Sequence, residues 1–107
     1  MSKQHLYRVV YQAQGEVIEI FARQVSQGGL FGFIEIGELV FGERSSVVVD
    51  PAEERLKEQF KDVDSFFLPM HSVLRVDVVN KQGKAKISKA EGGSNVTPFP
   101  IYTPTER

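Results

Sequence analysis

Two histidines, His5 and His71, are the only side chains of this 107-residue sequence whose ordinary pKa lies near neutrality. His71 follows a proline at the start of a strand-like run, where its ring could act as a general base or bind a partner. No phosphate-binding glycine loop and no nucleophile-elbow motif accompanies it. We therefore favour a structural role, in which His71 hydrogen-bonds the backbone beside Pro69, and we expect no catalytic activity.

Three glutamates, Glu35, Glu38 and Glu43, lie in a glycine-punctuated stretch and could serve a metal ion or glycoside chemistry if two of them converged. In a regular strand Glu35 points away from Ile34 and Ile36, which is typical of a solvent-facing side chain. The sequence has no cysteine, which excludes disulfides and thiolate ligands for zinc or iron–sulfur clusters. We expect neither a metal site nor a cofactor.

Phe31 and Phe33 alternate along a short strand between glycines and could stack on the bases of single-stranded RNA. Arg44 and Arg75 could then contact phosphates. The sequence has eight phenylalanines and no tryptophan, so phenylalanine must fill much of the interior of a small β domain. For that reason we favour Phe31 and Phe33 as core residues.

A second candidate contact for nucleic acid is a run of lysines without an intervening acid: Lys81, Lys84, Lys86 and Lys89. The run could bind RNA or an acidic protein. Lysines on an edge strand also protect a sheet against aggregation, and we favour that interpretation.

Composition indicates one globular domain. Hydrophobic residues make up 41% and charged residues 25%, and a formal net charge of −1 excludes a globally basic nucleic-acid-binding protein. No apolar run approaches the roughly 20 residues that span a bilayer, and no signal peptide precedes the first strand-like run. We expect a cytoplasmic protein without a membrane segment.

Short strands separated by glycine turns dominate the pattern. Runs of β-branched and aromatic residues predict strands over residues 6–11, 16–23, 33–41, 46–49, 65–68, 73–80 and 84–89. Gly15 favours a hairpin between the first two strands, Gly37 a kink within the third, and Gly83 a hairpin between the last two.

The run over residues 73–80 alternates at period two. This pattern places Leu74, Val76 and Val78 toward the core, and Arg75 and Asp77 away from it.

One helix is signalled after residue 49. Asp50 is of the type that caps helix N-termini, Pro51 suits the first helical position, and Glu53 completes a capping-box pattern. Leu56 and Phe60 form a narrow apolar stripe, typical of a short surface helix that adds little to a core.

Together these elements predict a mainly β (α+β) fold. We expect a small, strongly bent antiparallel sheet, or an SH3-like or Sm-like barrel, with one short surface helix. A flat sheet with the helix on one face is the alternative.

The sequence changes character after residue 90. Residues 91–107 are rich in glycine, proline, serine and threonine, so we interpret residues 1–90 as the folded domain and residues 91–107 as a C-terminal tail. Phe99 and Tyr102 are the largest apolar side chains of this tail, and their spacing suits an extended segment that lies along a groove or sheet edge of a partner. We expect removal of the tail to leave stability unchanged.

Three strings are particular enough to indicate a family: GERS at residues 42–45, VVVDPAEERL at 47–56 and LPMHSVLRV at 68–76. They resemble a family of short proteobacterial proteins, domain of unknown function 1820, over roughly residues 6–87. That resemblance implies no activity, cofactor or site residue. A proline followed by a short Val-Leu-rich strand and a turn also resembles the closing part of Sm-like barrels, which include protease adaptors with a flexible tail.

These observations favour a non-enzymatic binding module, namely a protein–protein adaptor or regulator that acts through a sheet edge or the C-terminal tail. The alternative is an RNA-binding Sm-like or SH3-like module that uses the Phe31/Phe33 strand and the hairpin from Lys81 to Lys89. A homo-oligomer is a further expectation, because a small β domain with open edges often buries one against a second copy. The candidate partner-binding residues are Phe31, Phe33, Arg44, His71, Arg75, Lys81, Lys84, Lys86, Lys89, Phe99 and Tyr102.

Overall fold

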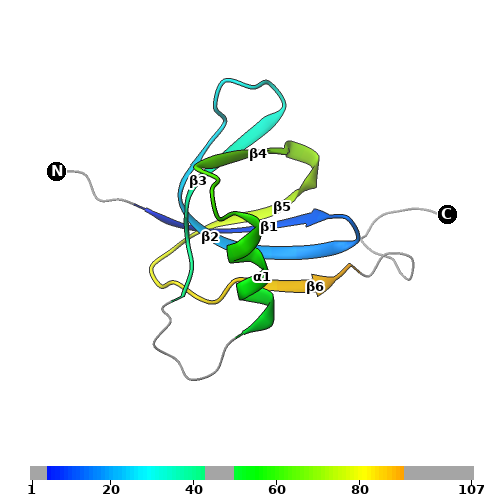
Figure 1. Ribbon diagram of the computed structural model, residues 1–107. Coiled ribbons are helices and arrows are strands. Elements are labelled where there is room, and N and C mark those ends of the chain that lie inside the picture. The colour runs from blue at the N-terminus through cyan, green and yellow to red at the C-terminus, as the bar shows by residue number, and fades with distance from the viewer. Residues whose placement is uncertain (1–4, 43–49, 91–107) are drawn as a thin grey trace.

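The computed structural model describes residues 5–42 and 50–90. Its strands are β1 (Leu6–Ala13), β2 (Glu16–Ser26), β3 (Phe33–Val40), β4 (Ser65–Pro69), β5 (Val73–Val79) and β6 (Lys86–Lys89). The helix α1 (Pro51–Gln59) follows β3, and a short 3₁₀ helix, η1 (Met70–Ser72), joins β4 to β5 (Figure 1). The predicted mainly β fold with one short helix is confirmed. The strand expected at 46–49 lies outside the described residues, as do Glu43, Arg44, Phe99 and Tyr102.

The six strands form one antiparallel sheet in the order β4-β3-β2-β1-β5, with β6 paired to the first half of β2. The long strand β2 serves three neighbours: β1 along residues 16–22, β6 along residues 16–19 on its other edge, and β3 along residues 21–26. The sheet bends strongly without closing into a barrel (Figure 1). Within the described part of the chain, β4 and β5 are therefore its two ends.

The β1–β2 hairpin shows how local chemistry sets the register. Gln14 and Gly15 have positive φ angles of 53° and 78°, a geometry whose twist matches that of paired strands. The ladder runs from the Ala13–Glu16 pair beside the turn along both strands. The predicted pairing of these two strands is confirmed.

The kink in β3 falls one residue later than predicted. The ladder between β2 and β3 skips Arg23 and Glu38. Glu38 has a left-handed backbone φ of 54°, which residues other than glycine rarely adopt. The Gln24 side chain lies against Gly37, because a Cβ there would lie 2.6 Å from Gln24 Oε1 and would displace the end of that side chain. Gly37 thus permits the close approach of Gln24, and Glu38 carries the change in backbone direction.

The core lies on the face of the sheet that α1 covers (Figure 1). Leu56 of α1 is fully buried, and Phe60, just after the helix, stacks on Phe66 of β4 with 4.6 Å between ring centroids. The prediction that the helix adds little to the core is wrong, because its narrow apolar stripe forms one layer of that core. The buried cluster consists of Val9, Tyr11, Ile18, Ile20, Ala22, Ile36, Leu56, Leu68 and Ala85.

The hairpin predicted between the last two strands does not form. β5 pairs with β1, and β6 instead pairs with β2, where Ile87 lies opposite Ile18. The segment between β5 and β6 passes close to the buried Phe21, since a Cβ on Gly83 would lie 3.1 Å from its ring. Pairing with β2 places Ile87 beside the core cluster.

The start of α1 matches its predicted cap. Asp50 Oδ1 accepts hydrogen bonds from the backbone N–H groups of Ala52 at 3.0 Å and Glu53 at 3.4 Å, and Pro51 begins the helix. Glu53 does not complete a capping box. Its Oε2 instead accepts from the backbone N–H groups of Gly42 at 3.0 Å and Ala85 at 3.3 Å, so one buried carboxylate ties two other segments to the helix.

We expect Asp50→Ala to lower the free energy of unfolding by about 0.5–2 kcal/mol, because two N–H groups at the start of α1 lose their acceptor. Asp50→Ser keeps a capping oxygen and should retain most of the stability. Urea titration followed by circular dichroism measures both variants. A midpoint for Asp50→Ala equal to that of the wild type would show that another group caps the helix.

Candidate functional site

The edge strand β5 presents an apolar surface to solvent. Leu74, Val76 and Val78 are 53%, 37% and 64% exposed. Val76 lies opposite Val9 and Val78 opposite Tyr7 in the ladder with β1, so both valines are on the core face of the sheet. The predicted orientation of Val76 and Val78 is right. Their predicted burial is wrong, because the core face of the sheet extends past the area that the described elements cover.

A register shift marks the start of β5. Val10 pairs with Arg75, whereas Tyr11 pairs with Val73, so Leu74 has no opposite residue on β1. Such bulges bend edge strands and redirect their side chains. Leu74, Val76 and Val78 are the exposed large apolar residues of β5, and we call these three residues the β5 surface.

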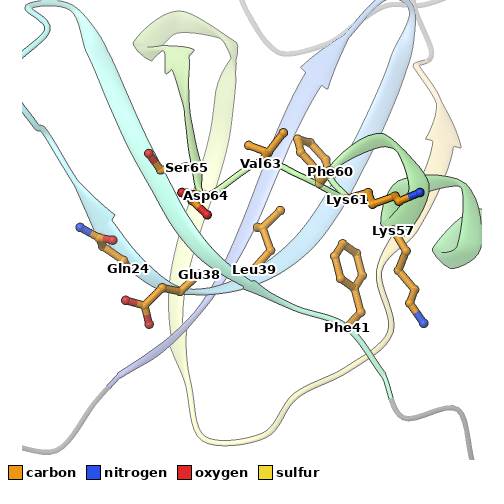
Figure 2. Close-up of a pocket in the computed structure, with 10 residues that line it drawn as sticks. All are labelled: Gln24, Glu38, Leu39, Phe41, Lys57, Phe60, Lys61, Val63, Asp64 and Ser65. Carbon is orange, nitrogen blue, oxygen red and sulfur yellow. The ribbon is translucent and has the colours of Figure 1, made fainter.

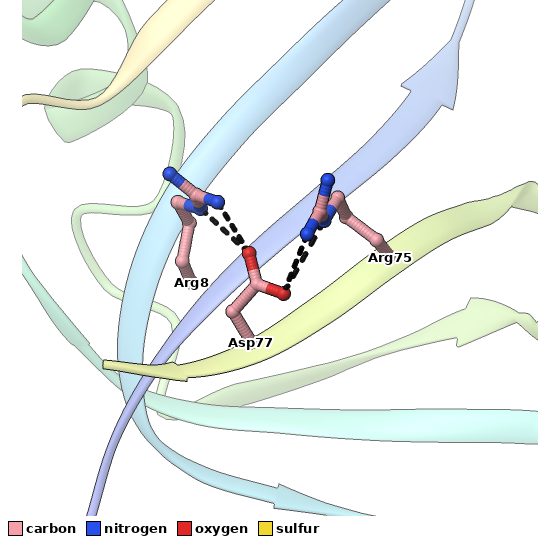
Figure 3. A network of polar contacts seen from close by, with 3 residues as sticks. All are labelled: Arg8, Arg75 and Asp77. Carbon is pink, nitrogen blue, oxygen red and sulfur yellow. Dashed lines mark hydrogen bonds and ion pairs between the residues drawn. The ribbon is translucent and has the colours of Figure 1, made fainter.

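The opposite face of β5 is polar (Figure 3). Asp77 Oδ2 accepts hydrogen bonds from Arg8, from Nε at 3.0 Å and also from Nη2, and Oδ1 accepts from Arg75 Nε at 3.2 Å and Nη2 at 3.1 Å. The hydrogen bond from Arg8 is the main cause that holds the pKa of Asp77 below its ordinary value, and Arg75 adds to it. Arg75, a candidate for phosphate contacts, is thus engaged by a carboxylate of its own strand.

We expect Asp77 to make stability depend on pH in the acid range. Its pKa is lower in the folded protein than the value of about 3.9 in an unfolded chain. Its contribution is therefore complete above that value and is lost as the pH falls through the folded-state pKa. Asp77→Asn should flatten the fall of the melting temperature below about pH 4, and an acid slope equal to that of the wild type would contradict this.

Phe31 stands at the tip of the β2–β3 connection and is 98% exposed, with Leu30 and Met70 also exposed nearby. The expectation that Phe31 is a core residue is wrong. Gly32 has φ 81° and the N–H of Phe33 donates to Leu30 O at 3.1 Å, so residues 30–33 form a turn and not a strand. Phe31 is a central residue of that turn, whereas Phe33 is half-buried at the start of β3.

The lysine run is interleaved with acids from other segments. In the β2–β6 ladder Lys86 lies opposite Glu19 and Lys89 opposite Glu16. Lys84 Nζ lies 3.8 Å from Asp50 Oδ2. β6 has no strand neighbour besides β2 among residues 5–42 and 50–90, which supports the interpretation of these lysines, with Lys81, as edge protection.

The structure places two parts of the predicted RNA surface apart (Figure 1). The turn that carries Phe31 and the strand that carries Lys86 lie on opposite sides of the molecule (Figure 1). The hydroxyl of Ser72 donates a hydrogen bond to the carbonyl oxygen of Pro69 at 2.9 Å, while the side chain of its neighbour His71 is exposed. The part of the chain that is described holds no cluster of three or more metal-ligating residues and no helix that could cross a membrane.

A cleft of about 620 Å³ lies between β3 and the end of α1 (Figure 2). Lys57 and Lys61 lie at its helical end, and Glu38 and Asp64 lie at the other (Figure 2). The remaining lining residues are Gln24, Leu39, Phe41, Phe60, Val63 and Ser65. Because the lining comes from separate segments of the chain, no local sequence pattern reveals it. Ser65 Oγ donates to Glu35 Oε2 at 3.0 Å, a contact between β4 and β3.

The structure belongs to the class of strongly bent, open antiparallel sheets, and its edge strand β5 exposes apolar side chains. Residues 5–101 match the model of the domain of unknown function DUF1820, so the chain belongs to that family. The resemblance found in the sequence is thereby confirmed, and the match continues past Lys89, the last residue of β6. No curated protein and no solved structure matches the chain.

Proposed function

We propose that this protein is a protein-binding module, an adaptor or regulator, whose β5 edge receives an extended segment of a partner. One observation carries the proposal: the apolar β5 surface is exposed on a strand with no outer neighbour among the described residues. The unpaired edge offers backbone N–H and C=O groups to an added strand, and the side chains beside it select the partner's sequence.

The charges around β5 support a protein partner over RNA. Binding to nucleic acid depends on cations that neutralise phosphates. Arg8 and Arg75, the cations beside β5 on its polar face, both hydrogen-bond to Asp77. The β5 surface itself is apolar, which suits a hydrophobic contact between proteins.

Capture of partners from cell lysate by the full-length protein tests the proposal, with identification by mass spectrometry before and after nuclease treatment. Val78→Asp places a carboxylate on the β5 surface, and Val63→Asp makes the same change at an exposed valine outside it. We expect Val78→Asp to reduce capture of the nuclease-resistant partner at least about tenfold, because an unpaired charge buried in an interface is costly.

Val63→Asp should retain that capture. Both variants should have the melting temperature of the wild type, because both valines are exposed. Capture that survives Val78→Asp, or that disappears with nuclease, would overturn the proposal.

A further inference from the structure

The sequence of β5 is close to symmetric about its central residue. It reads VLRVDVV over residues 73–79, with Val76 in the middle. The outer positions are apolar on both sides, whereas the two neighbours of Val76, Arg75 and Asp77, carry opposite charges. A strand with this pattern is complementary to a copy of itself that runs in the opposite direction, because each charge then meets its opposite.

A two-fold axis through Val76 gives this pairing. In antiparallel strands, opposite residues direct their side chains to the same face of the sheet. With the axis at Val76, Arg75 of each copy lies opposite Asp77 of the other, so two pairs of opposite charge form on the polar face. Val76 lies opposite Val76 of the second copy, and Leu74 lies opposite Val78. The two β5 surfaces thus meet each other.

Other positions of the axis lose this match. An axis at Arg75 places two arginines opposite each other, and an axis at Asp77 does the same with two carboxylates. Like charges that lie directly opposite are destabilising. An axis two residues from Val76, in either direction, places a charged side chain opposite a valine. Among axes within two residues of the centre of β5, charge complementarity therefore selects the one at Val76.

The contacts around Asp77 permit the exchange of one arginine for another (Figure 3). Arg8 of β1 donates to Oδ2 and holds the carboxylate in place, while Oδ1 accepts from Arg75 of its own strand. The side chain of Arg75 is 63% exposed, so its contact with Asp77 is weak and competes with water. Arg75 of a second copy, directly opposite, can donate to the same carboxylate without leaving either charge unpaired.

The edge is open on the side that this pairing needs. β5 has no outer neighbour within residues 5–42 and 50–90, and its large apolar side chains are exposed. A two-fold contact uses the same surface on both copies, so this one surface is enough to build it. β5 is 7 residues long, and so short a ladder belongs with the small interfaces that associate weakly and reversibly.

We propose that two copies of this chain pair through β5, antiparallel about a two-fold axis at Val76, and join their sheets into one. This inference rests on the proposed function, because it uses the same edge, and it adds the regulation of that edge. An extended segment of a partner must displace the second copy, which otherwise covers the β5 surface.

A single cysteine at the axis tests the pairing, because the natural sequence has none. Val76→Cys places two thiols on opposite residues, whose Cα atoms lie about 4.5–5.5 Å apart in antiparallel strands and thus within disulfide range. Val63→Cys is the matched control outside β5, since Val63 is 40% and Val76 37% exposed. We expect Val76→Cys to form disulfide-linked dimers at least about tenfold faster than Val63→Cys. Equal rates would overturn the proposal.

Cysteines at the two flanking apolar positions test the register. Leu74→Cys alone, or Val78→Cys alone, leaves its two thiols about 13 Å apart along the strands, since position 74 lies opposite position 78. An equal mixture of the two variants should therefore give mixed disulfide dimers at least about tenfold faster than either variant with itself. Faster linkage of either variant with itself would exclude the axis at Val76.

Arg75→Glu tests the charge pairs. It replaces both pairs of opposite charge by pairs of like charge, one on each side of the axis. Lys61→Glu makes the same change in net charge at an exposed position outside β5. We expect the dissociation constant of the dimer, measured by analytical ultracentrifugation, to rise at least about tenfold for Arg75→Glu and less than about twofold for Lys61→Glu. Equal constants for the two variants would contradict the proposed pairing.

Partner capture distinguishes this inference from the proposed function. Capture per chain should fall as the protein concentration passes the dissociation constant of the dimer, because the second copy then occupies the edge. A constant capture would overturn the regulation. Slow Val76→Cys linkage together with a loss of capture in Val78→Asp would overturn only the self-pairing and leave the edge as a binding site. Fast Val76→Cys linkage with capture unaffected by Val78→Asp would overturn the proposed function.

Discussion

Leu56→Ala is expected to lower the free energy of unfolding by about 2–5 kcal/mol, whereas the same substitution at Leu74 should cost about 1 kcal/mol or less. Leu56 is fully buried between α1 and the sheet, so its truncation leaves a cavity in the core. Leu74 is 53% exposed on β5 and leaves none. Chemical denaturation of both variants measures the difference, and equal losses would show that the β5 surface is part of the core.

Glu53→Ala is the second substitution for which we expect a large loss, of about 3 kcal/mol, because one buried and one half-buried N–H group lose a charged acceptor. The N–H groups of Gly42 and Ala85 both donate to Glu53 Oε2, so the variant frees the segments after β3 and before β6.

Glu53→Gln keeps a carbonyl oxygen within reach of both donors and should lose less than half as much. Glu54→Ala is the matched control at the neighbouring exposed position, where we expect a change of about 0.5 kcal/mol or less. Equal denaturation midpoints for Glu53→Ala, Glu53→Gln and Glu54→Ala would show that the Glu53 carboxylate does not stabilise the fold.

Local chemistry made the hairpin and the helix start predictable. The turn at Gln14 and Gly15 and the cap at Asp50 depend on residues close together in the sequence, and both form as expected. The position of β6 was not predictable in this way, because Gly83 indicated a turn but not which strand the chain would join.

Burial was harder to predict than orientation. Alternation correctly placed Val76 and Val78 on one face of β5, but whether a face is covered depends on elements elsewhere in the chain. The error for Phe31 has the same origin. A glycine after an aromatic residue fits a strand bend and a turn equally well, and only the hydrogen bond between Phe33 and Leu30 decides between them.

Among the candidate sites, the sequence indicated a sheet edge without saying which one. The structure supports β5, whose surface is apolar, over β6, whose lysines face acids on β2. The acidic partners of Lys84 and Arg75 are, respectively, far along the chain and two residues away, and neither pairing follows from spacing alone.

Site-specific photocrosslinking tests the binding role of the β5 edge most directly. A photoreactive side chain is placed at position 78 on β5, at position 31 in the exposed turn, or at position 84 in the lysine run, each in the full-length protein. We expect position 78 to give a covalent adduct with a nuclease-resistant protein partner, and positions 31 and 84 to give little of it. Adducts with that partner from position 31 or 84 and none from position 78, or adducts to RNA alone, would contradict the assignment of the β5 edge as a protein-binding site.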